Sequence, residues 1–254
     1  GGIAAKYIYL KDNVPFIIHE HSRSTITNPL YEKYVKDVLE FSCANIAVNK
    51  DIKKALEEAS KKSASIIPNF IDTARFDVKK EKTTKDFILI NISNFYQVKA
   101  LDVLLKALNI VVNEKGHKDI KLKIVGGGEY KDYYRSVTNS LNLNSNVEFT
   151  GYVDNNEIPK LLSESDVVCV SSNFETFCIP IIEGFAAGNP AISTDCIGPR
   201  EIINKKTGIL TPISNVEKYA DAIINMKKNY KKYNSNEIKK YVREKNDKSV
   251  ISKK

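Results

Sequence analysis

The chain has 254 residues, of which 42% are hydrophobic and 28% are charged, and its formal net charge at pH 7 is +8. This length predicts one large domain or two modest ones, each with its own core, and the composition is ordinary for an α/β protein. No apolar run reaches the roughly 18–20 residues of a membrane-spanning helix, so no segment is predicted to span a membrane.

The positive charge is mostly lysine and concentrates after Met226. Such charge influences association rather than fold. A nucleic-acid partner is not favoured, because the lysines lack interleaved arginines and aromatic platforms in one stripe. Two alternatives stay open for the lysine-rich tail. We favour a solvated helix face over peripheral contact with an anionic lipid surface at the inner face of the membrane.

The cysteines lie far apart in the sequence and show no C-x-x-C spacing. This pattern predicts free buried thiols in a reducing cytoplasm, with neither a metal site nor a disulfide framework. The four are Cys43, Cys169, Cys178 and Cys196. We therefore predict a cytoplasmic protein without a metal or another cofactor.

The first part of the chain alternates helices and strands. Helices are predicted over residues 1–14, 28–42 and 51–62, and strands over residues 15–22 and 43–50. The first strand ends in the polar residues HEHS, and polar side chains at the carboxyl end of a strand are typical of a site. His21 and His19 point to one face and Glu20 to the other, which argues against a metal site. A histidine satisfied by local hydrogen bonds is the equal alternative for His21.

A charged run over residues 77–86 predicts a solvated linker between two domains. Strand-to-helix units then alternate between Phe87 and Tyr219, which is typical of a doubly wound parallel sheet. The run GGGE at residues 126–129 is not a G-x-G-x-x-G fingerprint, so it does not predict dinucleotide binding. Its glycines are explained by a tight turn into a helix.

The most informative stretch runs from Asn173 to Pro190. It follows a short valine-rich run that predicts a buried strand, and Pro180 can open the helix that comes next. Glu175 is predicted in the loop and Glu183 in the first turn of this helix, with seven residues between them. Free N–H groups at a helix start can hold a diphosphate, and carboxylates accept hydrogen bonds from sugar hydroxyls. Glu183 alone has a plainer alternative, since the helix dipole favours a carboxylate there by about 0.3–1 kcal/mol.

The sequence ETFCIPIIEGFAAGNPAIST, residues 175–194, resembles the Glu-x7-Glu donor motif of the retaining GT-B glycosyltransferases of family 4. The matching positions are Glu175, Phe177, Glu183, Ala186, Gly188 and Pro190. Flanking phrases at residues 15–22, 65–76 and 149–153 match as well. The resemblance covers about residues 15–225, and it implies a Rossmann-like donor domain preceded by part of a second Rossmann-like domain. It also implies a chain truncated at both ends.

The resemblance implies a role for each matched position. Glu183 would hold the ribose hydroxyls of the donor and Glu175 its sugar. The backbone N–H groups around Phe177, Cys178 and Ile179 would hold the diphosphate together with Lys99, and His21 would face the sugar from the acceptor side. Further donor-binding candidates are Asn94, Gly127 and Val153, of which the last two lie near the nucleotide in the family.

Four positions depart from the family pattern, and one of them, Phe70, replaces a glycine in the phrase at residues 65–76. Cys178 and Ala100 stand where the family has glycine, and a side chain there narrows both the backbone angles and the approach of a ligand. Asn94 stands where the family has an arginine, which removes a bidentate phosphate contact. Arg200 either compensates for that loss or simply pairs with a neighbouring residue.

The resemblance implies four regions. They are an acceptor-side domain at residues 1–76, a linker at 77–86, a nucleotide-sugar-binding domain at 87–226 and a C-terminal crossover helix region at 227–254. The implied activity is transfer of a sugar, with retention and without a metal, from a nucleoside-diphosphate sugar to a saccharide or lipid-linked acceptor in surface polysaccharide or glycolipid assembly. Two alternatives stay open: a GT-B-fold epimerase or phosphorylase, and a degenerate nucleotide-sugar-binding protein without turnover.

Overall fold

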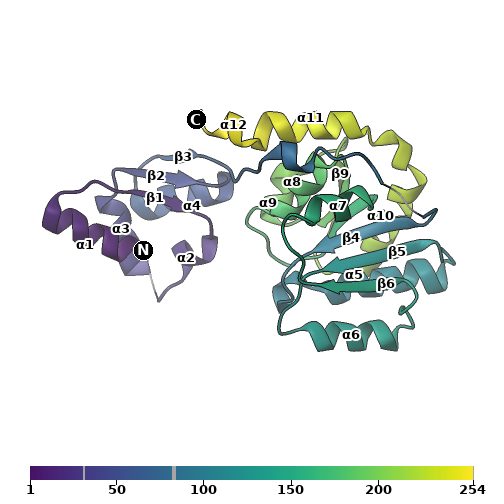
Figure 1. Cartoon of the computed structure of the whole chain (residues 1–254). Coiled ribbons are helices and arrows are strands. Elements are labelled where there is room, and N and C mark those ends of the chain that lie inside the picture. Colours follow the sequence, from purple (N-terminus) through teal and green to yellow (C-terminus); the bar gives the residue numbers. More distant parts are fainter. Residues whose placement is uncertain (31, 82–83, 254) are drawn as a thin grey trace. The chain divides into compact units, whose positions relative to one another are not determined.

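A computed structural model describes residues 1–30, 32–81 and 84–253 (Figure 1). The chain forms two compact units, of which one comprises Gly1–Phe70 with Ile251–Lys254 and the other Ile71–Val250. Each unit contains a parallel sheet with helices, as the alternating sequence pattern predicts. Residue 31 of the predicted helix 28–42, and residues 82 and 83 of the predicted linker, lie outside the described residues.

The first unit has a three-stranded parallel sheet in the order β1-β2-β3. Its elements are α1 (Gly2–Asp12), β1 (Ile17–Glu20), α2 (Arg23–Thr27), α3 (Glu32–Phe41), β2 (Ala44–Ala47), α4 (Lys50–Ser60) and β3 (Ala64–Ile66). The buried faces of α3 and α4 supply its core, through Val38, Leu39, Ile52 and Leu56. Helix α2 was not predicted, because five residues are too few to show a helical period.

The second unit has a six-stranded parallel sheet in the order β6-β5-β4-β7-β8-β9. The strands are β4 (Phe87–Ile92), β5 (Ile120–Val125), β6 (Val147–Gly151), β7 (Val167–Val170), β8 (Ala191–Thr194) and β9 (Gly208–Thr211). Strands β5 and β6 follow on one side of β4, and strands β8 and β9 follow on the other side of its neighbour β7. The loops after β4 and β7 therefore meet at the carboxyl edge, where open α/β sheets bind ligands.

Helices cover both faces of this sheet (Figure 1). The helices of this unit are α5 (Leu101–Asn109), α6 (Lys131–Ser140), α7 (Ile158–Ser163), α8 (Ile179–Ala186), α9 (Ile197–Ile202), α10 (Val216–Lys228) and α11 (Ser235–Asn246). The short helix α12 (Lys248–Ile251) follows α11, and its last residue belongs to the first unit. Short 3₁₀ turns lie at Thr73–Phe76, Gln97–Lys99 and Tyr230–Lys232, and a π-helical turn at Ile110–Glu114 extends α5.

Successive side chains along each strand point to opposite faces of the sheet. Leu89, Cys169 and Ile192 pack with α5 and α10 in the main core. Val168 points to the other face, and a Cβ added to Gly184 of α8 would lie 2.3 Å from its Cγ2 atom. Gly184 therefore lets α8 approach the sheet closely, which places the loop before α8 beside the end of β7. The doubly wound parallel sheet predicted from the sequence is confirmed.

The boundary between the units falls earlier than the predicted end of the first domain at residue 76. The N–H of Ile71 donates to the carbonyl of Asn246 at 3.0 Å. The carboxylate of Asp247 accepts from the N–H and the hydroxyl of Thr73 at 3.1 and 2.5 Å. Residues 71–76 are therefore fixed by the C-terminal segment of the second unit, a pairing over more than 170 positions that no local pattern reveals.

The described part of the run at residues 77–86 is not a free linker. Asp77 forms ion pairs with Lys239 and Arg243 at 2.7 and 3.3 Å, and Lys80 donates to the carbonyl of Ser165 at 2.6 Å. These contacts join Asp77 and Lys80 to distant parts of the second unit, so the charges of these two residues take part in pairing within that unit.

Of the four cysteines, three are buried as predicted, and Cys43 is exposed. All four are free thiols. Cys43 directly precedes β2, at a position that the strand pattern alone does not distinguish from its interior. No helix among the described residues is long and apolar enough to cross a membrane.

Candidate functional site

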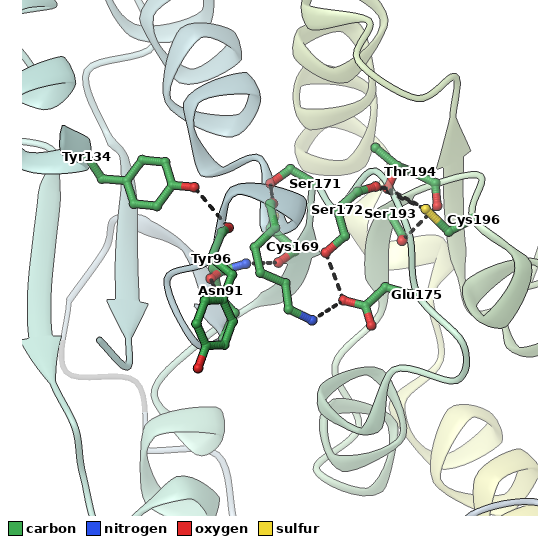
Figure 2. A network of polar contacts seen from close by, with 12 residues as sticks. Asn91, Tyr96, Tyr134, Cys169, Ser171, Ser172, Glu175, Ser193, Thr194 and Cys196 are labelled. Carbon is green, nitrogen blue, oxygen red and sulfur yellow. Dashed lines mark hydrogen bonds and ion pairs between the residues drawn. The ribbon is translucent and has the colours of Figure 1, made fainter. Parts of the chain in front are cut away.

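The candidate site is built from the loops that follow β4 and β7 (Figure 2). Lys99 ends the first loop and Glu175 lies in the second. The Lys99 Nζ atom lies 2.7 Å from Glu175 Oε1, and the two side chains are 24% and 13% exposed. The structure therefore brings together two of the predicted site residues, which are 76 positions apart in the sequence.

Two consecutive serines at the end of β7 hold this pair. The Ser172 hydroxyl donates to Glu175 Oε1 at 2.8 Å, and the Ser171 hydroxyl donates to the backbone carbonyl of Lys99 at 3.0 Å. The N–H of Asn173 also donates to the carbonyl of Val98 at 2.8 Å. The end of one strand therefore fixes both sides of the ion pair.

The same strand end is tied to β8. The carbonyl of Ser172 accepts from Thr194 Oγ1 at 2.5 Å and from Cys196 Sγ at 3.0 Å (Figure 2). Ser171, Ser172, Thr194 and Cys196 were not predicted as site residues. The available signal was their position, since each follows or ends a buried strand at the carboxyl edge of the sheet, as His21 does in the first unit.

Gly198 supports the loop from the side of α9. Its N–H donates to the carbonyl of Glu175 at 2.9 Å. A Cβ at this position would lie 2.6 Å from the N, Cα and O atoms of Phe177. The absent side chain at Gly198 therefore lets α9 approach the Glu175–Phe177 backbone.

Cys178 sets the start of α8. Its φ of 81° and ψ of 75° lie in the left-handed region, where glycine is favoured. The helix begins only after it, at Ile179, so Pro180 is its second residue rather than its first. Glu183 is the fifth residue and lies beyond the first turn, which corrects the predicted position. Burial raises the pKa of the Cys178 thiol well above its usual value, so the thiol is neutral at physiological pH.

The start of α8 retains the features of an anion site. Within the described residues, the N–H groups of Cys178 and Ile179 donate no hydrogen bond. These groups follow Phe177, whose side chain is buried and anchors the turn. The three residues that the sequence assigned to diphosphate binding thus form the tight turn into the helix.

Glu183 has a different environment from Glu175. It is half-buried, and no described residue donates a hydrogen bond to its carboxylate. Burial raises the pKa of Glu183 above its usual value, and the nearby charge of Arg75 partly offsets this. Arg75 itself donates to the Asn155 carbonyl and to Asn156 Oδ1, both at 3.3 Å. Arg75 was not predicted, because it lies before the region assigned to the donor domain.

The loop after β4 carries the second left-handed residue. Ala100, with φ 45° and ψ 44°, ends the Gln97–Lys99 turn and begins α5. Asn94 is exposed, and its carbonyl accepts from Tyr96 N–H at 3.0 Å. Positions 100 and 178, two of those where the family pattern has glycine, therefore keep a backbone suited to glycine while bearing a side chain.

Gly127 and Val153 lie in neighbouring turns. The carbonyl of Gly127 accepts from Phe95 N–H at 2.8 Å, and a Cβ on Gly127 would lie 2.8 Å from the ring of Tyr152. Val153 is half-buried, two residues after the end of β6. The glycine turn thus packs against the loop after β4 on one side and the loop after β6 on the other.

Arg200 pairs with a neighbouring residue rather than with the Lys99–Glu175 pair. Arg200 is exposed, and its guanidinium binds the side chain of Asp195 at 2.7 Å and its carbonyl at 2.9 Å. This local pairing is one of the two alternatives left open by the sequence. His21 belongs to the first unit, which is described by itself.

The histidines of the first unit form a pair at the end of β1. The rings of His19 and His21 have centroids 4.3 Å apart, and His19 Nε2 lies 3.2 Å from the carbonyl of Ile67. Burial and the neighbouring His21 lower the pKa of His19. Glu20 Oε1 accepts from the N–H groups of His21 and Ser22 at 2.9 and 2.8 Å. The described residues contain no group of three or more His, Cys, Asp or Glu side chains that could hold a metal ion.

Sequence comparison identifies the family to which this site belongs. The family model described as "Glycosyl transferases group 1" matches residues 72–245. An uncharacterized glycosyltransferase of Haemophilus influenzae is 26% identical over 223 residues, which cover 84% of this chain and 61% of that protein. The N-acetyl-alpha-D-glucosaminyl L-malate synthase of Bacillus anthracis is 29% identical over 213 residues, which cover 80% and 55%. The chain thus spans a little over half the length of these relatives.

Solved structures share the fold across almost the whole chain. Anabaena HepE in complex with UDP-glucose matches with a TM-score of 0.86 and 18% identity, covering 99% of this chain and 74% of that one. The sucrose-phosphate synthase of Thermosynechococcus elongatus matches with a TM-score of 0.84 and 19% identity, covering 99% and 68%. At this identity the likeness concerns the fold alone, and it confirms the predicted GT-B fold.

Proposed function

The chain belongs to the glycosyl transferases group 1 family, and on this premise we propose that it transfers a sugar from a nucleoside-diphosphate sugar with retention of configuration. The acceptor in this proposal is a saccharide or a lipid-linked saccharide, in the assembly of a surface polysaccharide or glycolipid. The observation that carries the proposal is the Lys99–Glu175 pair beside the start of α8, at the point where the strand order of the sheet reverses.

The site offers a separate group for each part of such a donor. Glu183 would accept hydrogen bonds from the ribose hydroxyls, and Glu175 from the hydroxyls of the sugar. Lys99 and the N–H groups of Cys178 and Ile179 would hold the diphosphate. Stabilising the charge that develops on the leaving diphosphate is then the main catalytic contribution, supplied by these groups rather than by a metal ion.

Relatives support the donor class. The HepE structures contain UDP, UDP with glucose, or UDP-glucose. A matching protein of Rhizobium meliloti is a glycosyltransferase of lipopolysaccharide core biosynthesis, and one of mouse uses GDP-mannose. These relatives differ in base, sugar and acceptor, so the proposal for this chain names a class of donor and acceptor rather than one compound.

A cytoplasmic location is part of the proposal. The free thiols support it, because disulfides are rare in reducing compartments. Peripheral contact of the lysine-rich tail with a membrane has less support than the cytoplasmic location. Lys239, Arg243 and Lys248 already form ion pairs with Asp77 and Asp72, so a share of the positive charge of the tail is neutralised within the unit.

The donor site is tested by thermal unfolding of the purified chain with UDP, GDP and ADP. A ligand at 100 times its dissociation constant stabilises by about 2.7 kcal/mol. We expect one nucleotide to raise the midpoint for the wild type and for Glu217→Gln, an exposed control on α10, and to lose most of this effect in Glu183→Gln. An equal shift in all three proteins would reject the assignment of Glu183, and no shift with any nucleotide would reject the donor site.

Retention is tested without an acceptor. Slow hydrolysis of an α-configured sugar donor that carries the base that binds releases a free sugar, whose anomer can be followed by NMR before it equilibrates. The proposal expects the α anomer first. Initial release of the β anomer would contradict retention.

Binding without turnover is the second candidate, and Cys178 favours it. Its buried side chain occupies a left-handed position at the start of α8, where the family has glycine. In this case the nucleotide would bind, but no sugar would be released over hours of incubation. Restoration of turnover by Cys178→Gly would identify the cysteine as the cause.

A further inference from the structure

Ser172 is a buried polar residue that contacts the ion pair directly. It is 2% exposed, and its carbonyl accepts from both Thr194 and Cys196 on the adjacent strand end. These bonds fix the backbone from which its side chain extends. The hydroxyl then donates to Glu175 Oε1 at 2.8 Å (Figure 2).

The two oxygens of Glu175 are used unequally. Oε1 accepts from both Ser172 and Lys99, at 2.8 and 2.7 Å. Oε2 accepts no hydrogen bond from the described residues. Two donors on one oxygen fix the rotation of the carboxyl group and leave the other oxygen available to a ligand hydroxyl.

We propose that Ser172 is a positioning residue that orients the Glu175 carboxylate for recognition of the donor sugar. The inference rests on the proposed function for the identity of the ligand. Ser172 itself is too buried to be assigned a contact with the donor, so it acts through Glu175. A charge-assisted hydrogen bond to a carboxylate is strong enough to hold one rotamer against solvent.

Ser171 provides a comparison within the same strand end. Its hydroxyl donates to the backbone carbonyl of Lys99 rather than to the carboxylate. Loss of this bond would shift Lys99 as a whole and weaken UDP and UDP-sugar binding alike. Loss of the Ser172 hydroxyl would instead affect mainly the part of the affinity that the sugar provides.

The first experiment measures the binding of UDP, UDP-glucose, GDP and GDP-mannose by calorimetry. For the base that binds, the ratio of the two dissociation constants gives the contribution of the sugar. We expect Ser172→Ala to reduce this ratio about tenfold, as for loss of one charge-assisted hydrogen bond, with less than a twofold change for the nucleotide alone. Ser172→Thr, which keeps the hydroxyl, should restore most of the ratio.

Ser165→Ala is the matched control. Ser165 is also 2% exposed, and its hydroxyl donates to the carbonyl of Leu161 at 2.7 Å, away from the ion pair. This variant loses a buried serine hydrogen bond and should leave the ratio unchanged. An equal fall in both variants, or no fall in Ser172→Ala when the wild type binds, would overturn the positioning role.

A second measurement needs no donor. Amine acylation by an N-hydroxysuccinimide ester, followed by peptide mass spectrometry, reports how firmly Lys99 is held. We expect Lys99 to react at least twice as fast in Ser172→Ala as in the wild type, relative to Lys218 in the same samples. Unchanged labelling of Lys99 would overturn the inference, whether or not the chain binds a nucleotide. The absence of nucleotide binding would instead reject the proposed function, so the two failures can be told apart.

Discussion

Two carboxylates of the second unit are separated by seven residues and lie in opposite environments. Glu175 lies in an irregular loop, forms an ion pair with Lys99 and accepts a hydrogen bond from Ser172. Glu183 lies within a regular helix, half-buried, and no described residue donates a hydrogen bond to it. The loop gives one oxygen of its carboxylate two donors, whereas no described residue donates to the carboxylate of the helix.

The backbone shows the reverse contrast. Left-handed non-glycine residues flank the Lys99–Glu175 pair, namely Ala100 directly after Lys99 and Cys178 three positions after Glu175. Around Glu183 the backbone is helical and unstrained. Around Glu175 the side chains are paired and the backbone is strained. Around Glu183 the backbone is relaxed, and no described residue donates a hydrogen bond to the carboxylate. Both arrangements are typical of sites that have a function besides stability.

Replacing Glu175 should have the largest effect on stability. Glu175→Ala leaves the Lys99 ammonium and the Ser172 hydroxyl without their acceptor, both in a largely buried position. We expect a loss of about 2–3 kcal/mol in the free energy of unfolding, as for a charged hydrogen-bonding partner removed from a buried group. Urea unfolding followed by circular dichroism measures this, with Glu217→Ala on α10 as an exposed control. A loss below about 0.5 kcal/mol, which is usual for surface changes, would mean that the pair is not structurally important.

Replacing Glu183 should have the opposite sign. Glu183→Gln keeps the shape of the side chain and removes a charge that burial disfavours. We expect a gain of about 1 kcal/mol in stability, at the lower end of the cost of burying a polar group without a partner. The same unfolding experiment compares it with Glu175→Gln, which should be destabilising. If both glutamines change stability in the same direction, the contrast between the two environments is wrong.

Acidification should reduce the difference between the wild type and Glu183→Gln. Because the folded pKa of Glu183 is raised above its usual value of 4.5, its contribution to stability is fully present below pH 4.5 and is lost as pH rises through the folded pKa. The wild type should therefore approach the variant in stability as pH falls from 7 toward 4.5. Unfolding midpoints of both proteins at a series of pH values measure this.

Glu183 and Asp247 change their contributions to stability in different pH ranges. Hydrogen bonds from Ser249 and Thr73 hold the pKa of Asp247 well below its usual value of 3.8. The stability that Asp247 contributes is present above pH 3.8 and is lost only as pH falls through its lower folded pKa.

A constant difference between wild type and Glu183→Gln from pH 7 to 4.5 would show that Glu183 is not desolvated.

The sequence predicts this site as far as local patterns reach. Valine-rich runs place β7, and the spacing of Glu175 and Glu183 places both beside α8. The motif match also assigned Lys99 to this site, although Lys99 and Glu175 are 76 positions apart in the sequence. Hydrophobic periodicity and motif spacing are properties of the chain alone, so they can be recognised without coordinates.

The remaining details depend on contacts between distant segments or on backbone angles. The position of Glu183 beyond the first turn follows from the left-handed φ of Cys178, which delays the helix. The proximity of Arg75 to Glu183 follows from residues 71–76 being held by Asn246 and Asp247. The hydrogen bond from Ser172 to Glu175 depends on side-chain rotamers. None of these features has a periodic or compositional signature.

The smallest effect concerns the strain of the loop region. Ala100→Gly keeps the left-handed backbone and removes the clash of the Cβ, which costs about 1–2 kcal/mol, partly offset by the greater freedom of glycine in the unfolded chain. We expect a net gain of about 0.5 kcal/mol. Ala107→Gly, at a buried position within α5, makes the same chemical change in a regular helix and should lose about 1 kcal/mol.

The sign of the two alanine variants tests the strain directly. Both remove one methyl group from a buried position of the same region, so they share any cost of lost packing. Only the backbone angles differ, with φ in the left-handed region at Ala100 and within a helix at Ala107. Stabilisation by the first and destabilisation by the second would place strain in the loop beside Lys99. Destabilisation of equal size by both would show that the left-handed backbone at Ala100 carries no strain. The surroundings of Glu175 and Glu183 would then differ only in how the two carboxylates are paired.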